Sequence, residues 1–386
     1  MRTYRELFAT PEFMPLFLTS SAQIAAATVA GLALGTAIYT ETGSPLLSAL
    51  SMFGPSLAQV VGATVLLSAA DRLPPRAVLT GLALAFALGT AAQAVPGLPL
   101  WTVFVLILGL GVLASLGSGV RYGLLTEILP DEGYLLGRSV LNMSVGIMQI
   151  TGFAIGGVLV AALSPRGTLL AGAALYLAAA LLARLGLSRR PARAAGRPSI
   201  GETWRSNARL WSSVPRRYTY LALWLPNGLI VGCESLFVPY APEAAGLLFA
   251  LAALGMLVGD TAVGRFLPQR WLDRLGAPLR LLLAVPYLAL ALAPPLPVAA
   301  AAIVLASIGY CSTLLLQHRL MALTPPELSG HALGLHSAGM LTMQGVSAVL
   351  AGTLAQHTTP AIAMSLLALA SLAVTVALAP GLGAMP

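Results

Sequence analysis

The sequence predicts an all-α membrane protein in which twelve transmembrane helices form two six-helix bundles. Three observations lead to this fold class. Hydrophobic residues make up 58% of the 386 residues and charged residues only 9%, whereas a soluble domain usually carries about 25% charged residues. The apolar residues gather in runs of about 20 residues, the length that crosses a bilayer. Part of the sequence also repeats at half the chain length, as in membrane proteins built from two duplicated bundles.

Twelve apolar runs are long enough to span a membrane, and they are separated by glycine, proline and charged residues. The ninth run is the shortest. Charged residues precede the first run and no cleavage site follows a short apolar core, so we expect no signal peptide. The expected spans are Pro15 to Tyr39, Pro45 to Ala69, Ala77 to Val95, Leu100 to Leu125, Gly137 to Leu163, Thr168 to Leu187, Tyr218 to Tyr240, Ala244 to Val263, Leu279 to Ala293, Pro297 to Leu320, His331 to Ala355 and Ala361 to Ala379.

The placement of arginine predicts the orientation. All 21 basic residues are arginines, and all except Arg166 fall on connections that share a side with the N-terminus. Basic residues near helix ends are retained in the cytoplasm, so we expect both termini there. The alanine- and arginine-rich composition without lysine is typical of a high-GC bacterial genome. We therefore expect a multi-pass protein of the bacterial inner (plasma) membrane.

A long basic connection and the internal repeat divide the chain in the same place. We expect an N-terminal six-helix bundle over residues 1–187, a cytoplasmic linker over 188–217 and a C-terminal six-helix bundle over 218–386. The repeat implies that a pseudo-two-fold axis along the membrane normal relates the bundles. At an offset of 193, half of the 386 residues, the matches are Gly137 with Gly330, Ser144 with Ser337, Gly146 with Gly339 and Gly152 with Gly345.

The linker contains the pattern of one short helix. Ser199 and Glu202 have the spacing of a capping box, and Ile200, Trp204 and Trp211 then share one face of the helix. This pattern is typical of an amphipathic helix that rests on the inner leaflet. A solvated linker is the alternative that stays open.

The absence of lysine excludes several chemistries. A phosphate-binding loop needs lysine for the terminal phosphates, and Schiff-base cofactors need a lysine amine. Cys233 and Cys311 lie in separate apolar segments, and no pair of histidines or cysteines has the spacing of metal ligands. The net charge of +8 is explained by arginines beside membrane helices rather than by nucleic acid binding. We expect a monomer in the lipid bilayer, without a cofactor or metal.

Two local motifs resemble the major facilitator superfamily. Between the second and third spans, Ala70-Asp71-Arg72-Leu73-Pro74-Pro75-Arg76 is similar to the signature GxLaDrxGrkxxl, although Leu67 and Pro74 replace its glycines. In the fifth span, Gly152-Phe153-Ala154-Ile155-Gly156-Gly157 is similar to the GPxxGG segment of drug/proton antiporters, with Phe153 in place of proline. The region Leu129 to Gly157 also resembles enterobactin-exporter-like members. The resemblance implies the major facilitator fold and transport by rocking of the two bundles.

The first motif implies a cytoplasmic gate. By resemblance, Asp71 and Arg72, with Arg76 nearby, clamp the cytoplasmic ends of the helices in the outward-open state. Arg121 near the inner end of the fourth span is a candidate partner, and Arg265 matches Arg72 in the repeat. A second interpretation stays open, in which Asp71 caps the next helix while Arg72 binds lipid phosphates.

Glu234 is the leading candidate for proton coupling. It lies in the seventh span, where an acid is costly unless it faces a cavity or a partner, and burial favours the neutral, proton-carrying form of a carboxyl. The alternative is a hydrated glutamate close to the outer surface. Asp260 in the eighth span is a second candidate, either as a gate with Arg265 or as an interfacial charge.

Uncharged polar residues at membrane depth are the candidates for a substrate cavity. Each needs a partner in hydrocarbon, so interhelical hydrogen bonds without a ligand are an equally open interpretation. For His336, packing with a hydrogen bond is the alternative to titration near neutral pH. These residues are Gln23, Asn142, Gln149, Asn227, His336 and Gln344.

Together these features favour a secondary active transporter that is not an enzyme. We expect proton-coupled antiport, with efflux of a hydrophobic or weakly polar small molecule by alternating access, because the deep surface is almost free of charge apart from Glu234. Efflux follows mainly from the resemblance, so an importer or a non-transporting receptor on the same fold stays open. An intramembrane enzyme is disfavoured because no HExxH or GxSxG motif is present.

Overall fold

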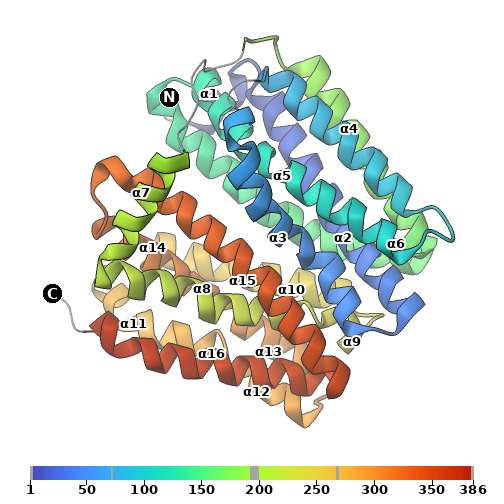
Figure 1. The fold of residues 1–386 in the computed structure, drawn as a ribbon, viewed down its shortest axis with the longest axis vertical. Coiled ribbons are helices and arrows are strands. Elements are labelled where there is room, and N and C mark those ends of the chain that lie inside the picture. The colour runs from blue at the N-terminus through green and yellow to red at the C-terminus, as the bar shows by residue number, and fades with distance from the viewer. Residues whose placement is uncertain (1–2, 71–72, 192–199, 267–268, 384–386) are drawn as a thin grey trace. The chain divides into compact units, whose positions relative to one another are not determined.

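The computed structural model describes residues 3–70, 73–191, 200–266 and 269–383, and every regular element in these ranges is helical (Figure 1). Within them, eleven stretches are long and apolar enough to cross a membrane. The elements are α1 Tyr4–Ala9, α2 Phe13–Thr42, α3 Pro45–Ala70, α4 Pro75–Gln93, α5 Leu100–Ile128, α6 Asp131–Gly186, α7 Ile200–Ser212, α8 Val214–Glu234, α9 Phe237–Tyr240, α10 Ala245–Thr261, π-helical η1 Ala262–Phe266, α11 Gln269–Leu282, α12 Val285–Leu288, 3₁₀-helical η2 Ala289–Leu292, α13 Leu296–Ile308, 3₁₀-helical η3 Gly309–Cys311, α14 Ser312–Ala322, 3₁₀-helical η4 Pro326–Leu328, α15 Ser329–His357 and α16 Pro360–Gly383.

One of the eleven stretches has the length of two crossings. The 56 residues of α6 would extend about 84 Å as a straight helix, far more than a bilayer requires. Ser164 inside it has a positive φ of 70° and non-helical geometry, and Pro165 follows. The chain therefore forms two helices joined at Ser164, between the predicted fifth and sixth spans. Dividing α6 there gives twelve spans among the described residues.

Proline marks the beginning of several helices. Pro45, Pro75 and Pro360 each occupy the first position of a long helix. A proline costs nothing there because its missing N–H would have had no partner within the helix, and its fixed φ suits the helical conformation. The prolines that separate the apolar runs in the sequence thus define where helices begin.

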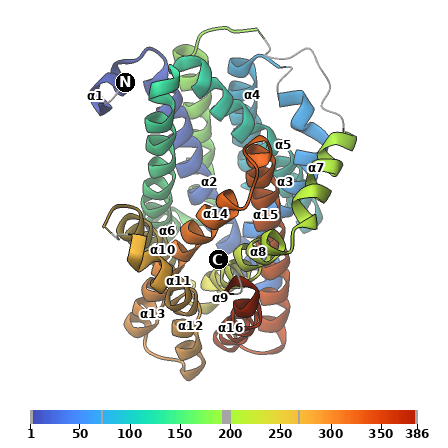
Figure 2. The same cartoon turned by 90° about the vertical axis from the view of Figure 1, so that its left-hand side faces the viewer.

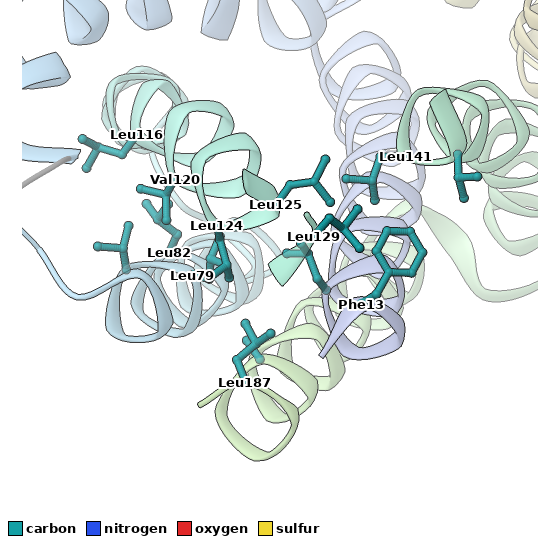
Figure 3. Packing of buried hydrophobic residues seen from close by; sticks show 14 of the residues in the cluster. Phe13, Leu79, Leu82, Leu116, Val120, Leu124, Leu125, Leu129, Leu141 and Leu187 are labelled. Atoms are coloured by element: carbon teal, nitrogen blue, oxygen red, sulfur yellow. The ribbon is translucent and has the colours of Figure 1, made fainter. Parts of the chain in front are cut away.

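The chain packs as two units, which we describe separately. The first unit comprises Met1–Glu41, Gly54–Arg197 and Glu243–Ala250. Its core is a cluster of leucines and aromatic side chains from α1, α2, α4, α5 and α6 (Figure 3). The labelled members of this core are Phe13, Leu79, Leu82, Leu116, Val120, Leu124, Leu125, Leu129, Leu141 and Leu187.

The second unit comprises Thr42–Phe53, Pro198–Pro242 and Leu251–Pro386. In this unit α8 packs against both α15 and α16 (Figures 1 and 2). Gly228 and Gly232 permit the close approach of α8 to α15, because a Cβ atom at either position would lie within 3.0 Å of Met343 or Ser347. Small residues at such contacts are typical of helix pairs in membranes.

Irregular backbone interrupts the second unit at three places that matter for the site. The helix α8 ends at Glu234, and the single turn α9 follows after two residues. The predicted ninth span is divided into α11, α12 and η2 rather than forming one helix. The predicted tenth span is interrupted by η3 between α13 and α14. Short 3₁₀ segments within a helix often mark a functional hinge.

The predicted linker helix is present as α7, and it packs on the second unit. The ring of Trp211 stacks on Trp224 of α8 at 5.8 Å with an interplanar angle of 8°, and Leu210 is fully buried. Trp204, by contrast, has 73% of its surface exposed. Part of the face expected to meet lipid therefore contacts protein. Ser199, the predicted cap of this helix, lies outside the described residues.

Candidate functional site

Glu234 lies at the last position of α8, where the helix gives way to a turn. The Ser235 N–H donates to the Val231 carbonyl oxygen at 2.9 Å, and the Leu236 N–H donates to the Cys233 carbonyl oxygen at 3.1 Å. Only 7% of the Glu234 surface is exposed, and its Oε1 atom has no hydrogen-bond partner among the described residues. A buried polar atom without a partner is rare in folded proteins and requires an explanation.

Two tyrosine hydroxyls approach the Glu234 carboxyl from other elements. Tyr310 of η3 lies beside it, and Tyr287 of α12 is close enough for electrostatic interaction with both. Tyr287 is fully buried. Apart from the contact between Tyr310 and Glu234, neither hydroxyl has a hydrogen-bond partner among the described residues. We name these three side chains the Glu234 cluster.

Glycine and proline position the two tyrosines. Gly309 precedes Tyr310, and a Cβ atom there would lie 2.6 Å from the Leu283 Cα and 2.8 Å from the Leu279 carbonyl oxygen. Only glycine permits this approach, so η3 sits directly on the break between α11 and α12. Pro286 precedes Tyr287 at the start of the single turn α12, where it cannot donate a backbone hydrogen bond. The local sequence thus forces both tyrosines onto irregular backbone.

The remaining polar neighbours of the cluster are already paired. The Cys233 thiol donates to the Met364 carbonyl oxygen at 3.2 Å and approaches the Leu229 carbonyl at 3.5 Å. The Ser365 hydroxyl donates to the backbone carbonyl of Tyr287 at 3.0 Å, which ties α12 to α16. The thiol is therefore paired with a backbone carbonyl rather than with the Glu234 carboxyl.

A second polar group in the same unit joins α8, α14 and α15. The Asn227 amide donates to the Thr313 hydroxyl at 3.0 Å and to the Leu223 carbonyl at 2.8 Å. The amide of Gln317 and the Nε2 atom of His336 lie 3.1 Å apart, while the buried Nδ1 of His336 has no partner among the described residues. The structure thus pairs two of the predicted cavity residues with α14 side chains that the sequence analysis missed.

Asp260 and Arg265 lie on either side of a helical irregularity. Asp260 is near the end of α10, and the π-helical turn η1 follows and contains Arg265. Both side chains are exposed, and the Asp260 carboxyl is near enough to Cys311 to interact electrostatically. No ion pair joins Asp260 to Arg265 in the described ranges. A π-helical turn inside an α-helix often occurs at a functional site.

The first unit holds the described part of the predicted gate. Asp71 and Arg72 lie outside the described residues. Arg121 of α5 donates to the Ser20 hydroxyl of α2 at 2.8 Å, and its guanidinium carbon lies 5.0 Å from the centroid of the Tyr122 ring. The Tyr122 hydroxyl in turn donates to Asn142 of α6 at 2.8 Å. The geometry therefore links three helices through Arg121 and its neighbours.

The remaining candidates are spread over the fold. Gln344 makes an interaction of its own, so it is not a free polar group. The structure does not bring these residues together with the Glu234 cluster in any contact between described side chains. Arg76, Gln23 and Gln344 are half-buried, and Asn142 and Gln149 are exposed.

The glycines of the antiporter-like motif line close helix contacts in the first unit. A Cβ atom on Gly152 would lie 2.9 Å from the Thr28 side chain of α2, and one on Gly157 would lie 3.2 Å from the Gly246 Cα. Phe153, which replaces the proline of the motif, stacks on Phe249 at 4.6 Å. The small residues of the motif are thus explained by packing, which does not by itself indicate antiport.

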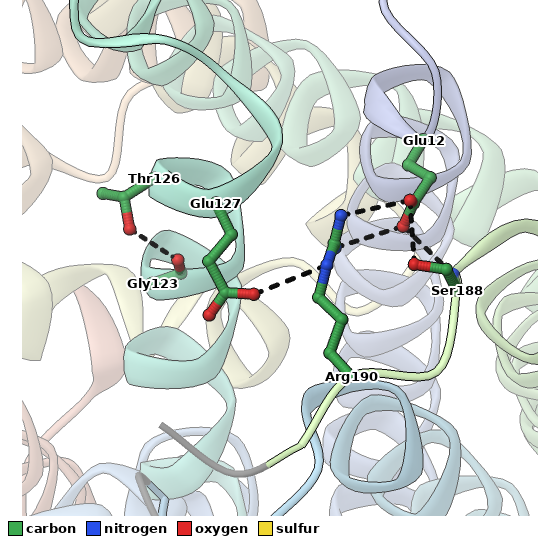
Figure 4. A network of polar contacts seen from close by, with 6 residues as sticks. All are labelled: Glu12, Gly123, Thr126, Glu127, Ser188 and Arg190. Atoms are coloured by element: carbon green, nitrogen blue, oxygen red, sulfur yellow. Dashed lines mark hydrogen bonds and ion pairs between the residues drawn. The ribbon is translucent and has the colours of Figure 1, made fainter. Parts of the chain in front are cut away.

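An ion-pair network at the start of α2 was not foreseen from the sequence (Figure 4). Glu12 accepts hydrogen bonds from the backbone and hydroxyl of Ser188, at 3.0 and 2.9 Å, and from both terminal nitrogens of Arg190, at 3.2 and 3.1 Å. The Arg190 Nε lies 3.5 Å from Glu127 of α5. Glu12 has a positive φ of 69°. We name Glu12, Glu127, Ser188 and Arg190 the Glu12 network.

Metal binding finds no support in the described residues, where no three His, Cys, Asp or Glu side chains converge.

The functional candidates that were not predicted from the sequence had weak local signals. Tyr287 and Tyr310 resemble apolar core residues, although Pro286 and Gly309 beside them indicate broken helix. Thr313 and Gln317 are four residues apart on one helical face.

Comparisons with known proteins identify what the chain is similar to. The sequence profile of the Major Facilitator Superfamily matches residues 16–337. Comparison with curated proteins finds no match. Among solved structures, a bacterial homologue of the human lysosomal transporter Spinster, inward-facing and unoccupied, is similar over 99% of this chain and 93% of its own, with 16% identity and a TM-score of 0.69.

Two other solved transporters are similar over nearly their whole length. A mutant of the nucleoside transporter NupG has 12% identity and a TM-score of 0.79, covering 96% of this chain and 99% of its own. A POT family transporter in complex with a thioalcohol-conjugated peptide has 14% identity and a TM-score of 0.74, covering 95% of this chain and 94% of its own. At such identities the likeness shows the fold alone.

Proposed function

The chain belongs to the Major Facilitator Superfamily, and from that premise we propose that it is a proton-coupled secondary transporter that exports a hydrophobic or weakly polar small molecule. It is a multi-pass membrane protein with the fold of transporters. The observation that carries the proposal is the buried Glu234, whose Oε1 atom has no partner among the described residues. The transported molecule and the proton are its partners, and no cofactor is required.

Glu234 is the proton carrier in this proposal. An ionised carboxylate without a cation is costly in a low-dielectric interior, so a buried acid favours its neutral form. Proton binding neutralises a charge that the low-dielectric interior disfavours. The relative free energies of the transporter's conformations therefore depend on whether Glu234 carries a proton. Asp260 is the second candidate, because it precedes the π-helical turn η1.

The substrate preference follows from the neutral character of the polar groups. The pairs Asn227 with Thr313 and Gln317 with His336 offer amide, hydroxyl and imidazole groups. Such groups suit hydrogen bonding to a weakly polar molecule, whereas a strongly ionic substrate requires a lasting opposite charge. Gln23, Asn142, Gln149 and Gln344 are the further cavity candidates.

Alternating access in this proposal takes place between the two six-helix halves, residues 1–187 and 218–386. The gate consists of Asp71, Arg72 and Arg76 with Arg121 and Arg265, and the arginine distribution supports a cytoplasmic location for it and for both termini. Asp71→Asn is expected to lower transport without lowering the amount of protein in the membrane. Unchanged flux in vesicles would remove the gate from the proposal.

The test is transport in everted bacterial membrane vesicles. A panel of hydrophobic fluorescent compounds is supplied with and without an imposed pH gradient. Glu234→Gln is expected to reduce gradient-driven accumulation at least tenfold, while exchange of substrate across the membrane at equal pH persists, because only the proton step is lost. Glu41→Gln is the matched control, since Glu41 is exposed and pairs with Arg166.

Two results would redirect the proposal. Gradient-driven accumulation that survives Glu234→Gln rules out its role in coupling. Accumulation in right-side-out vesicles rather than everted ones indicates an importer, and the absence of countertransport in proteoliposomes indicates a channel or receptor on the same fold.

A further inference from the structure

Three breaks in membrane helices meet around one carboxyl group. Glu234 ends α8, Tyr287 lies on the single turn α12, and Tyr310 lies on the 3₁₀ turn η3. Irregular backbone at membrane depth is tolerated only where protein surrounds it or water reaches it. Here Gly309 brings η3 onto the break that precedes α12, so the breaks support one another. Helix interruptions in transporters are typically associated with binding sites for ions or substrate.

The polar atoms of these breaks are incompletely satisfied. The Oε1 atom of Glu234 and the hydroxyl oxygens of Tyr287 and Tyr310 are all buried. Apart from the contact between Glu234 and Tyr310, none of them has a hydrogen-bond partner among the described residues. These oxygens belong to three different elements, α8, α12 and η3. A buried polar group that lacks a partner costs about 1–3 kcal/mol, so buried oxygens that have few partners beyond one another make this cluster a candidate site.

The neighbouring charges do not explain the carboxyl. Within the described ranges no ion pair involves Glu234, and the Cys233 thiol beside it donates to the Met364 carbonyl. The titratable groups that face Glu234 are therefore Tyr287 and Tyr310. Both carry hydroxyls, which donate to a carboxylate and also accept from a protonated carboxyl.

We propose that Glu234, Tyr287 and Tyr310 form one proton-binding site, in which Tyr310, assisted by Tyr287, stabilises the Glu234 carboxylate after its proton has left. A buried acid with apolar neighbours alone would hold its proton too strongly to release it. Two O–H donors lower the cost of the charged form without a positive side chain. Tyr287 and Tyr310 are thus positioning residues that make proton release by Glu234 reversible.

The step balances without any further reactant. In the loaded state the carboxyl O–H donates to one hydroxyl oxygen. On release, the O–H bond of the carboxyl breaks, the proton passes to water, and both tyrosine hydroxyls rotate to donate to the carboxylate. Each tyrosine keeps its own proton, and no oxidation takes place. The site alternates between two hydrogen-bonding patterns of the same three groups.

The experiment is infrared difference spectroscopy of the full chain in lipid, with pH as the only variable. Wild-type protein is expected to show the carbonyl band of a protonated carboxyl that disappears on raising pH and is absent in Glu234→Gln. Tyr310→Phe removes one donor, so the band is expected to change frequency and to disappear about one pH unit higher. That displacement is a tenfold change in proton affinity. Tyr287→Phe is expected to act in the same direction with a smaller displacement.

The matched control is Tyr220→Phe. Tyr220 is a fully buried tyrosine of α8 whose hydroxyl donates to the Ala332 carbonyl at 3.3 Å, so its removal costs a hydrogen bond outside the cluster. It is expected to leave the band and its pH dependence unchanged. Thermal melting of each variant separates altered proton binding from loss of fold, and Tyr287→Phe provides a second reading if Tyr310→Phe does not fold.

The role in transport rests on the proposed coupling by Glu234, and the two failures are distinguishable. If Tyr310→Phe changes the carboxyl band but Glu234→Gln leaves transport unchanged, the site is supported and its role in coupling is rejected. A band that persists in Glu234→Gln, or one that neither tyrosine variant affects, overturns the site itself. In the Glu234→Gln background, a further loss of transport on Tyr310→Phe also contradicts the proposal, because Tyr310 acts through Glu234.

Discussion

The Glu12 network and the Glu234 cluster each surround a glutamate carboxyl, but they differ in how many hydrogen bonds that carboxyl accepts. Glu12 lies on strained backbone in the first unit and accepts four hydrogen bonds from Ser188 and Arg190. Glu234 ends a helix in the second unit, and its Oε1 atom accepts none from the described residues. Glu12 is 19% exposed at its side chain and has a bidentate arginine. Glu234 is buried, and its polar neighbours are two tyrosine hydroxyls and the Cys233 thiol rather than a cation among the described residues.

This difference separates a carboxylate with a structural role, Glu12, from a carboxyl group whose protonation we propose to change, Glu234. Bidentate contacts between arginine and a carboxylate are strong hydrogen bonds, so the contact between Glu12 and Arg190 ties the start of the linker to α2. Hydroxyls are able to hydrogen-bond to either protonation state of a carboxyl, which is why we propose that Glu234 exchanges a proton. In the first unit the strain of a positive φ is stabilised by the contacts that surround it. In the second unit the buried Oε1 atom without a partner is the observation on which the proposed proton site rests.

The largest effect is expected from a substitution that disturbs the backbone on which the Glu234 cluster is built. Gly309→Ala places a Cβ atom against the Leu283 backbone, which cannot rotate away as a side chain can. We expect a loss of about 1–3 kcal/mol in the free energy of unfolding, typical of overpacking, together with loss of gradient-driven transport. Unfolding in detergent or lipid measures the first, and vesicle transport measures the second.

Gly334→Ala is the matched control for that substitution. Gly334 lies within α15 of the same unit, and a Cβ atom there would meet nothing within 4 Å. Alanine is the better helix former by about 1 kcal/mol, so stability is expected to be unchanged or higher. Equal losses in the two variants would mean that the close approach at Gly309 has no special role.

The next largest effect concerns the Glu12 network. Arg190→Gln removes the cation that lies between Glu12 and Glu127 and leaves two carboxylates close to each other. We expect a loss of about 1–2 kcal/mol, less than for a fully buried pair because these side chains are about a quarter exposed. Thermal unfolding at low and high salt measures it, and Arg189→Gln serves as the neighbouring control. No loss in Arg190→Gln would make the network a surface contact only.

The two regions also differ in how far the sequence predicts them. The position of Glu234 follows from composition, because an acid in an apolar run is conspicuous. Its partners do not, since Tyr287 and Tyr310 resemble core residues and come from breaks set by tertiary contacts. The Glu12 network is not predictable at all by spacing, because Arg190 lies 178 residues from Glu12.

The fold is predictable for a different physical reason. The bilayer imposes span length and arginine placement on each helix separately, so both are readable from the sequence. The predicted fold class is confirmed. The ninth span, the shortest of the twelve, is where local hydropathy failed to show that the chain forms α11, α12 and η2. Asp71 and Arg72, the strongest part of the gate motif, lie outside the described residues, so the gate stays a prediction.

A smaller effect tests the strain at Glu12. Asn tolerates a positive φ better than Gln does, and neither keeps the carboxylate. Glu12→Asn and Glu12→Gln are therefore both expected to lose the contacts to Arg190, with Asn retaining about 0.5–1 kcal/mol more of the stability. The difference in unfolding free energy between the two variants isolates the contribution of the backbone. If Gln is the more stable variant, the positive φ of Glu12 carries no cost.

The smallest expected effect gives the sharpest contrast between the two glutamates. Glu234→Gln keeps the shape of a protonated carboxyl and removes no ion pair, so the free energy of unfolding at neutral pH is expected to change by less than about 0.5 kcal/mol. Glu12→Gln, the same chemical change in the Glu12 network, is expected to cost more, because Arg190 then loses its bidentate acceptor. Both are measured by unfolding of the purified protein in the same lipid. If Glu234→Gln destabilises as much as Glu12→Gln, then Glu234 holds a structural partner and the adjustable charge proposed for it does not exist.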